Sequence, residues 1–381
     1  MDFELMVWED ICMEARWSKF CPAGAVSEYH VIIQPNNAHL SAEQQFRNIE
    51  TALNRVKKSL GENVNCLFKR YFVSDAVNQK NFLPGKNDHT ALSVVEQPPA
   101  GGCKVSVWSY LVQDCPTCRD EHSGTYIAKR PAYIHLYNTQ LHAPVADVET
   151  ETRSIFENYV NSLAAHGCTL KDNCIRTWIY VKGIDVHYTE MVKERKRFFE
   201  KEGLTPASHF IASTGIEGRC SDPLSSVLMD TYAIRGIQPA QVKYLKATTY
   251  LNPPCEYGVT FERATGVDYG DRRHVFVSGT ASINNKGEII HPLDIVKQTG
   301  RTFENIAVLL QQAEMQMSDV MQMIVYLRDI SDYTVVAEYL AVHYATTPYV
   351  LVLAPVCRSG WLVEAECIAV KAIENSAFER F

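Results

Sequence analysis

The chain has 381 residues, of which 46% are hydrophobic and 21% are charged, and its formal net charge at pH 7 is −7. This length allows two or three domains around a large core, and the apolar content excludes an intrinsically disordered chain. The negative charge argues against general affinity for nucleic acids or anionic membranes, and no apolar run reaches the roughly 20 residues that a transmembrane helix needs.

The first third of the chain combines one helix pattern with several strand patterns. Ser41–Leu60 has the periodicity of an amphipathic helix, with Phe46, Ile49, Leu53 and Val56 on one stripe. Short runs rich in β-branched and aromatic residues predict strands, and residues 1–28 add one or two more. The predicted strands that follow them are Tyr29–Gln34, Cys66–Val73, Leu92–Val95 and Cys103–Val112.

The same order of patterns returns twice further along the chain. The middle third predicts helices at Asp147–His166 and Tyr188–Glu202, and the last third predicts helices at Asp294–Gln312 and Thr334–Tyr344. Strands are predicted around these helices at Ala132–Thr139, Cys174–Val181, Phe210–Ser213, Ser226–Ile234, His274–Ser282 and Met321–Arg328.

Two residue types serve as markers that align the three copies. An asparagine recurs in the long helices, and a tyrosine follows it by 23, 22 and 21 residues in the next strand. The markers are Asn48 and Tyr71, Asn158 and Tyr180, and Asn305 and Tyr326. We therefore predict three α+β domains, residues 1–125, 126–238 and 239–381, that pack about a pseudo-threefold axis as one chain imitating a trimer. Ligand sites in such an object are expected at the seams.

The last strands are predicted to form a hairpin within Leu353–Ala369, with a tight turn at Ser359 and Gly360. In a two-residue turn Cys357 faces Leu362 across the hairpin. Strand alternation then places two glutamates, Glu364 and Glu366, on that same face.

A carboxylate inside such an apolar segment must be paired, solvated or protonated. Glu364 is therefore our candidate for an acid that keeps its proton. A structural ion pair with Arg358, or a side chain that points to water, is the alternative reading.

The cysteines and histidines predict no metal site. Cys115 and Cys118 form the C-x-x-C pair of the chain, but a zinc site needs a second pair at suitable spacing, so we expect an incidental loop feature. No His-x-x-x-His pattern occurs on a predicted helix. Asp2 and Glu4 do not fit the start of a signal peptide, so a cytoplasmic location is the expectation.

The last copy resembles the RidA family, also called the YjgF or endoribonuclease L-PSP family. The resemblance runs through Val275–Ala369 and rests on F-V-S-G-T-A-S-I-N, Q-T-G-R-T-F-E-N-I, S-D-V-M-Q and L-V-E-A-E-C-I-A. It implies a fold similar to Bacillus-type chorismate mutase, with sheets inside and helices outside. RidA proteins that hydrolyse imines carry an arginine some fifteen residues before the glutamate that matches Glu364, whereas Thr347–Val350 here holds none.

A second resemblance covers residues 176–366 and is to the chorismatases, which cleave chorismate. It rests on six runs in matching order: R-T-W-I-Y, E-R-K-R-F-F, A-S-T-G-I-E-G, Y-G-V-T-F-E-R-A, S-G-T-A-S-I and V-C-R-S-G-W-L-V-E-A-E. The run between Tyr257 and Phe261 is shortened relative to that family, and the first domain is not matched in detail.

The chorismatase resemblance implies an enzyme that releases pyruvate from chorismate or a related enolpyruvyl acid, with Glu364 as the general acid and no metal or organic cofactor. Two carboxylates on such a substrate call for arginines. The candidate catalytic residues are Glu364 and Cys357, and the candidate substrate-binding residues are Arg176, Tyr180, Arg195, Tyr257, Arg263, Gly279 and Arg358. Salt bridges and core packing are the competing roles for the arginines and tyrosines.

Two other functions remain open at this point. One is a RidA-like enamine or imine deaminase, and the other is a non-catalytic module that binds carboxylates. All three readings expect a small-molecule carboxylate partner, no nucleic acid and no membrane. They also expect a monomeric pseudo-trimer, and they leave further oligomerisation open.

Overall fold

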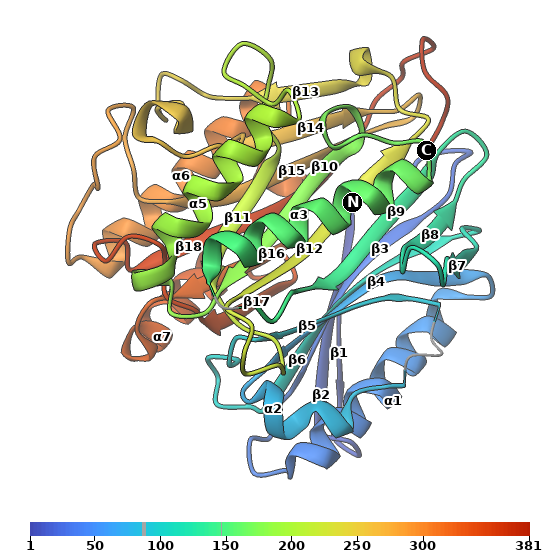
Figure 1. Ribbon diagram of the computed structural model, residues 1–381. Helices are drawn as coiled ribbons and strands as arrows, with labels where there is room; N and C mark the ends of the chain where they lie inside the picture. Colours follow the sequence, from blue (N-terminus) through green and yellow to red (C-terminus); the bar gives the residue numbers. More distant parts are fainter. Residues whose placement is uncertain (86–88, 146) are drawn as a thin grey trace.

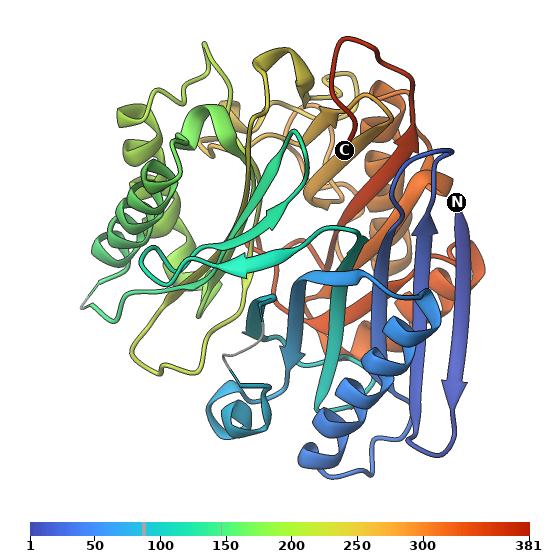
Figure 2. The ribbon, with the colours of Figure 1, turned by 90° about the vertical axis from the view of Figure 1, so that its right-hand side faces the viewer.

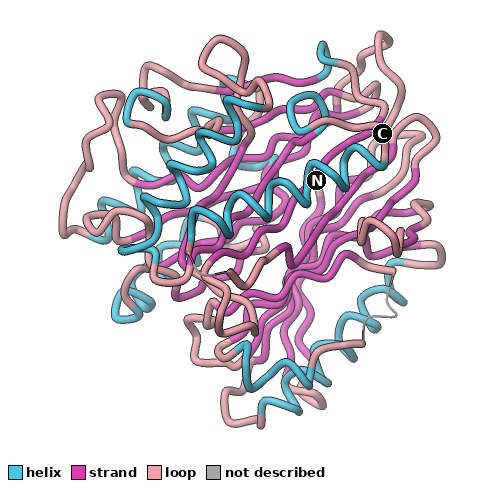
Figure 3. Tube along the Cα trace, in the orientation of Figure 1, coloured by secondary structure: helices cyan, strands magenta, loops and turns pink. Residues whose placement is uncertain are grey.

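The computed structural model describes residues 1–85, 89–145 and 147–381. Its strands form three six-stranded sheets, each built from one continuous third of the chain. The sheets occupy the middle of the molecule, and the long helices lie on the outside (Figures 1 and 3). No helix in these ranges combines the length and the apolar character needed to cross a membrane.

The first sheet has the strand order β1-β2-β3-β6-β4-β5. Its strands are β1 (Asp2–Trp8), β2 (Met13–Phe20), β3 (Glu28–Pro35), β4 (Val64–Val73), β5 (Ala91–Glu96) and β6 (Val105–Gln113). The long helix α1 (Ala42–Leu60) covers one face and buries the predicted stripe, and the short helix α2 (Ala76–Gln79) follows β4.

The second sheet has the order β11-β10-β12-β9-β8-β7. Its strands are β7 (Thr117–Arg119), β8 (Tyr126–Lys129), β9 (Ile134–Leu141), β10 (Cys174–Val181), β11 (Ala212–Glu217) and β12 (Val227–Arg235). Its helices are α3 (Val148–Ala165), the short α4 (Leu170–Asn173) and α5 (Ile184–Lys201).

The third sheet has the order β13-β14-β15-β18-β16-β17. Its strands are β13 (Val242–Leu245), β14 (Ala264–Asp268), β15 (Arg272–Ala281), β16 (Val320–Leu327), β17 (Tyr349–Leu353) and β18 (Val363–Ala372). Its helices are α6 (Ile295–Gln312) and α7 (Tyr333–His343).

The three sheets share one topology. Counting strands within each unit, every sheet has the order 1-2-3-6-4-5, and the fourth and fifth strands pair in parallel. The three units can be told apart in Figure 2, in which the molecule is turned by 90° from the view of Figure 1. The predicted fold class, three α+β repeats that form a pseudo-trimer, is confirmed.

Aromatic residues from different units meet in the shared core. Phe68 of the first unit stacks on Trp178 of the second, with ring centroids 5.8 Å apart. Tyr232 of the second unit lies 5.4 Å from Phe276 of the third. These rings belong to one buried cluster that draws on all three units, so the apolar surface between the sheets holds the pseudo-trimer together.

The clearest mark of the repeat is a polar residue in the first turn of each long helix. Gln45, Glu151 and Gln298 each stand four residues after a capping Ser or Asp. A side-chain oxygen of each accepts the backbone N–H of the residue before the sixth strand, at 2.7 Å, 2.9 Å and 2.9 Å. This bond ties the helix to the strand in all three copies.

The sequence markers for the first copy are wrong in register. Asn158 and Asn305 stand eleven residues after their caps, a position that Ala52 holds in the first unit rather than Asn48. In the strand, Phe72 is the counterpart of Tyr180 and Tyr326, because each precedes the residue that pairs with the start of the sixth strand.

Tyr71 therefore points to the opposite face of its strand from the other two tyrosines. Its hydroxyl bonds with Glu50 of α1 instead of facing the centre of the molecule.

The predicted hairpin at the C-terminal stretch is also wrong. β17 pairs in parallel with β16, and β18 lies between β15 and β16, so β17 and β18 are not neighbours. The residues between them form a loop in which Cys357 lies. The alternation of Glu364 and Glu366 was right, because both lie in β18.

The first domain boundary that we expected, after residue 125, falls inside a hairpin of the second sheet. β7 pairs with β8 from Thr117↔Ala128 to Arg119↔Tyr126, so the chain changes sheets between Gln113 and Thr117. Cys115 and Cys118, which we expected in a loop, stand at this change of sheet as free thiols.

Candidate functional site

A cavity of about 500 Å³ lies at the seam between the second and third units. Residues of helix α5 and strand β11 line it from the second unit, and residues of β15, β18 and the loops before β14 and β18 line it from the third. Figure 1 shows where these elements lie in the molecule. The cavity is thus located at the type of seam where the repeat predicted a site.

Backbone pairing closes this seam. Ala212 bridges to Glu262, and Ile216 bridges to Val356. The N–H of Glu217 also donates to the carbonyl of Pro355 at 3.1 Å. Because both ends of β11 are paired to loops of the third unit, the two cavity walls are fixed relative to each other.

Glu364 enters the cavity from the second position of β18 and is 5% exposed. Burial raises its pKa from the ordinary 4.5 to about 8, and the nearby charge of Glu366 acts in the same direction. The positive charges of Arg263 and Arg176 lower this pKa but do not outweigh those effects. At neutral pH the side chain is therefore a neutral acid that faces a cavity.

Gly279 of β15 creates the space that Glu364 occupies. A Cβ atom at this glycine would lie 2.0 Å from Oε1 of Glu364 and 3.0 Å from Cγ2 of Thr214. No side chain larger than hydrogen fits there unless the acid moves.

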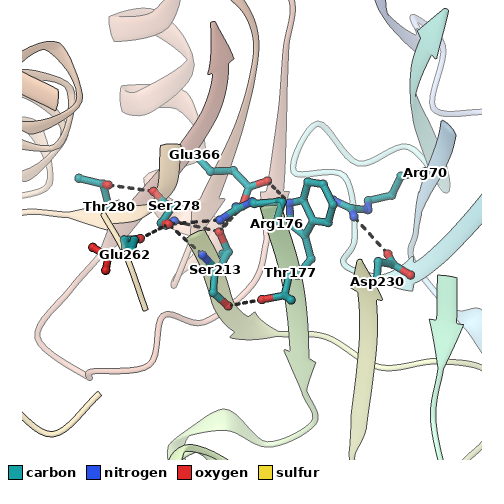
Figure 4. A network of polar contacts seen from close by, with 12 residues as sticks. Arg70, Arg176, Thr177, Ser213, Asp230, Glu262, Ser278, Thr280 and Glu366 are labelled. Carbon is teal, nitrogen blue, oxygen red and sulfur yellow. Dashed lines mark hydrogen bonds and ion pairs between the residues drawn. The ribbon is translucent and has the colours of Figure 1, made fainter. Parts of the chain in front are cut away.

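Glu366, two residues further along β18, is held by three donors from the second unit. Arg176 donates to its Oε2 at 2.7 Å, Trp178 donates to its Oε1 at 2.6 Å, and the hydroxyl of Thr214 bonds with Oε2. Figure 4 shows Glu366 facing Arg176 across the seam. A carboxylate with these partners is satisfied as an anion.

Ser278 extends this network towards the cavity. Its hydroxyl donates to the carbonyl of Glu262 at 2.6 Å and accepts from the backbone N–H of Ser213 at 2.9 Å and from Arg176 at 3.3 Å (Figure 4). The adjacent Gly279 N–H donates to Thr214 at 2.9 Å. The strand that shapes the pocket of Glu364 is therefore anchored to the second unit.

Three of the four predicted arginines line the cavity. Arg195 of α5 is buried and donates to Thr260 at 3.2 Å. Arg263 is buried and donates to the carbonyl of Asn252 at 3.0 Å. Arg358 lies over the ring of Trp361 at 4.9 Å. Three cations around one neutral acid favour an anionic ligand.

Cys357 also lies on the cavity wall, beside Tyr188 and Glu364. Loss of hydration around the thiol raises its pKa to about 12, and the charge of Glu364 adds to that effect. A hydrogen bond with Tyr188 and the charge of Arg358 oppose it. The thiol is therefore protonated at neutral pH, whereas a nucleophile of this kind needs the thiolate.

The structure brings together six of the nine candidate residues at the cavity: Glu364, Cys357, Arg195, Arg263, Gly279 and Arg358. The other three have different surroundings. Arg176 pairs with Glu366 behind the wall, and Tyr180 is buried with its ring 5.4 Å from the guanidinium of Arg70. The side chain of Tyr257 lies outside the described part of the structure.

Several lining residues were missed by the sequence reasoning. They are Tyr188, Val192, Lys193, Lys196, Phe261 and Trp361. Tyr188, Val192 and Arg195 are spaced by four and three residues on one helix face, so helical periodicity around Arg195 could have found the first two. Within the described ranges, no group of three or more His, Cys, Asp or Glu side chains is placed to hold a metal ion.

The seam between the first and second units repeats part of this arrangement. Asp230 stands at the position in β12 that Glu366 holds in β18, and it pairs with Arg70 at 3.1 Å and bonds with Ser93. Leu228 occupies the position in β12 that Glu364 occupies in β18. A paired carboxylate is thus present at each of these two seams. The neutral acid lies at the seam between the second and third units.

Comparison with known proteins identifies the family. The sequence model of the family described as "Endoribonuclease L-PSP" matches residues 265–371. A RutC family protein of Pyrococcus abyssi is 34% identical over 100 residues, which is 26% of this chain and 78% of that protein. A RutC family protein of Saccharolobus solfataricus is 32% identical over 109 residues, covering 28% of this chain and 85% of that protein. The chain belongs to this family through its third unit.

A solved structure extends the likeness beyond that unit. The crystal structure of a chorismatase covers 80% of this chain and 93% of its own, with a TM-score of 0.63 and 20% sequence identity. At this identity the likeness establishes the fold, in which three RidA-like units share one chain.

Proposed function

We propose that this protein is a chorismatase-like enzyme that cleaves the enol ether of chorismate or a related enolpyruvyl acid and releases pyruvate. The observation that carries the proposal is Glu364, a carboxyl group with a pKa of about 8 that faces a cavity lined by three arginines. The chorismatase fold supports the same reading.

The reaction needs an acid that is protonated near neutral pH, because the first step delivers a proton to the methylene carbon of the enol ether. Glu364 supplies that proton and becomes a carboxylate. Water attacks the oxocarbenium carbon, and its oxygen becomes the keto oxygen of pyruvate. The bond between this carbon and the ether oxygen on the ring breaks, and that oxygen takes one proton of the water, so that pyruvate and a ring alcohol leave. The second proton of the attacking water returns to Glu364, so the acid is regenerated.

The developing positive charge also fits the site. Once Glu364 has given up its proton, its carboxylate lies beside the oxocarbenium centre and stabilises it. Glu366 makes the deprotonated state of Glu364 costly in free energy, because two carboxylates then stand two residues apart on one strand face. Arg263 and Arg176, whose charges act on Glu364, limit that cost.

Arg195, Arg263 and Arg358 are assigned to the carboxylates of the substrate. Arginine binds a carboxylate through two parallel N–H donors, and it keeps its charge at every relevant pH. We assign Cys357 and Tyr188 to contacts with the substrate ring, because a protonated thiol with a pKa of about 12 packs as a small apolar group.

The test is a coupled assay for pyruvate with purified protein and chorismate. The wild-type protein is expected to release pyruvate, and Glu364→Gln is expected to lose about 10²–10⁴-fold in kcat, the usual contribution of a general acid. Glu374→Gln, the same chemical change at an exposed residue just after β18, is the matched control and is expected to retain full activity.

Two other outcomes would contradict the proposal and support a different function. Ammonia release from 2-aminoacrylate-type imines without any pyruvate from chorismate would indicate the deaminase of the RidA type. Binding of chorismate or a benzoate with no turnover would indicate a carboxylate-binding module.

A further inference from the structure

Strand β1 is the outermost strand of the first sheet, and its free edge lies at the surface of the molecule (Figure 2). It pairs with β2 on one side, and within the described residues no strand pairs with its other side. Leu5 is 56% exposed, Met6 37% and Val7 47%. Both faces of the strand are therefore open, since successive side chains point to opposite faces.

Apart from the acidic residues Asp2 and Glu4, this edge lacks the features by which proteins prevent sheets from joining. β1 pairs with β2 through seven consecutive residue pairs, from Asp2↔Lys19 to Trp8↔Met13, with no bulge. Its sequence, D-F-E-L-M-V-W, contains no proline and no lysine. A regular edge with five apolar residues out of seven is a template for another strand.

The strand is complementary to a second copy of itself in one antiparallel register. When the twofold axis passes through Leu5, all seven residues pair, with Leu5 opposite Leu5 and Phe3 opposite Val7. Glu4 then faces Met6, so no like charges stand directly opposite. An axis through Glu4 would oppose two glutamates, and an axis through Met6 would leave Asp2 and Phe3 without partners in the strand.

The register centred on Leu5 also fixes which charged groups meet at the ends of the strands. In this register Asp2 of one copy lies opposite Trp8 of the other, on the face that carries α1. The guanidinium of Arg55 in α1 lies 5.9 Å from the centre of the Trp8 ring and forms an ion pair with Asp10 at 2.6 Å. Each Asp2 would therefore approach the ion pair of Arg55 and Asp10 in the other copy, at both ends of the paired strands.

We propose that two copies of this chain associate through antiparallel pairing of β1 with β1, which joins their six-stranded sheets into one continuous sheet. The contact involves a single strand from each copy, so it is smaller than the interface of an obligate dimer, and its population depends on concentration. It lies on the first unit, away from the cavity, and does not depend on the proposed function.

Sedimentation analysis from low to high micromolar concentration tests this proposal. The wild-type mass is expected to rise from 43.0 kDa towards twice that value. Leu5→Lys is expected to remain monomeric, because it would place two lysines opposite each other at the centre of the contact. Val342→Lys, a comparable change at a 76% exposed residue of α7, is the control and is expected to dimerise as the wild type does.

A mixing experiment tests the register itself. Leu5→Lys and Leu5→Glu are each expected to be monomeric alone and to form a dimer when mixed, because the central pair then carries opposite charges. Oxidation of Leu5→Cys is expected to link two chains covalently, in contrast to the wild-type protein treated in the same way.

Wild-type protein that stays at 43.0 kDa at every concentration would overturn the proposal. A dimer that persists in Leu5→Lys would also overturn it, because association would then use another surface. Failure of the Lys and Glu variants to associate on mixing, with the wild type dimeric and Leu5→Lys monomeric, would reject the Leu5-centred register and with it the proposed pairing.

Discussion

Glu364 is a carboxyl group that burial and a neighbouring anion keep neutral. Its pKa of about 8 means that the protonated form persists until the pH rises through that value. If Glu364 is the general acid, kcat/KM for pyruvate release is expected to be flat near neutrality and to fall about tenfold per pH unit above pH 8. A pH profile measured with chorismate checks this. An alkaline limb that persists unchanged in Glu364→Gln would show that another group titrates.

The same raised pKa predicts a gain in stability when the acid is removed. Between the unfolded value of 4.5 and the folded value of about 8, the folded chain holds a proton that the unfolded chain has lost. Stability from this group therefore falls as the pH rises through this window. Glu364→Gln is expected to have a higher Tm than the wild type at pH 9 and a similar Tm at pH 4, measured by calorimetry. An equal or lower Tm at pH 9 contradicts the assigned protonation state.

Gly279 is expected to matter through the position of Glu364. In Gly279→Ala the new Cβ would stand 2.0 Å from Oε1 of Glu364, so the acid must move. A displacement of about 1 Å can cost about 100-fold in rate, and we expect a loss of that order in kcat. Gly266→Ala in β14, where the nearest atom to the new Cβ is 3.6 Å away, is the control. Activity that is retained in Gly279→Ala would mean that the acid has more freedom than the structure shows.

At the scale of elements, the polar residue in the first helical turn links each long helix to the sixth strand of its sheet. Gln298 is fully buried, and it accepts from Leu362 N–H at 2.9 Å and donates to the carbonyl of Gly360 at 2.9 Å. These groups lie on the loop that carries Cys357 and Arg358. The repeat element therefore also supports one wall of the cavity.

Gln298→Ala would leave buried backbone groups without partners. We expect a loss of about 1–3 kcal/mol in the free energy of unfolding, measured by urea titration. Lys297→Ala, at the exposed preceding residue, is expected to change stability by less than about 0.5 kcal/mol. If the two variants are equally stable, the bond between helix and strand contributes little.

At the scale of the whole molecule, the units are held together by buried charges as well as by apolar surface. Arg272 of β15 is fully buried and donates to Glu28 of β3 at 2.7 Å and to the carbonyl of Val26 at 2.8 Å. Burial by itself would raise the pKa of Glu28, but the charges of His274 and Arg272 outweigh it and hold that pKa well below its usual range. The third unit is thus tied to the first by an ion pair shielded from water.

Arg272→Met is expected to destabilise the protein by about 3–5 kcal/mol, because the buried carboxylate of Glu28 loses its arginine and keeps only His274 as a positively charged partner. Urea unfolding measures the change. The double variant Arg272→Met/Glu28→Gln is expected to recover part of it, since the carboxylate that lost its arginine is gone. If the double variant is no more stable than the single one, the loss arises from packing around Arg272 rather than from the charge on Glu28.

Local patterns in the sequence determined the elements and the repeat. The apolar stripe of α1, the helical patterns at Asp147–His166 and Asp294–Gln312 and the β-branched runs predicted most helices and strands within a few residues, because these signals depend on neighbours in the chain. Alternation in β18 also placed Glu364 and Glu366 on one face, since that relation needs no knowledge of other strands.

The tertiary structure alone decided which residues meet. β18 pairs with β15 and β16 rather than with β17, so the local turn signal at Ser359 and Gly360 did not decide the pairing. Arg176 and Arg195 looked alike in sequence, yet one is paired with Glu366 and the other lines the cavity. Contacts between distant segments depend on how sheets pack across a seam, and the free energy of that packing is not encoded in any short stretch of the chain.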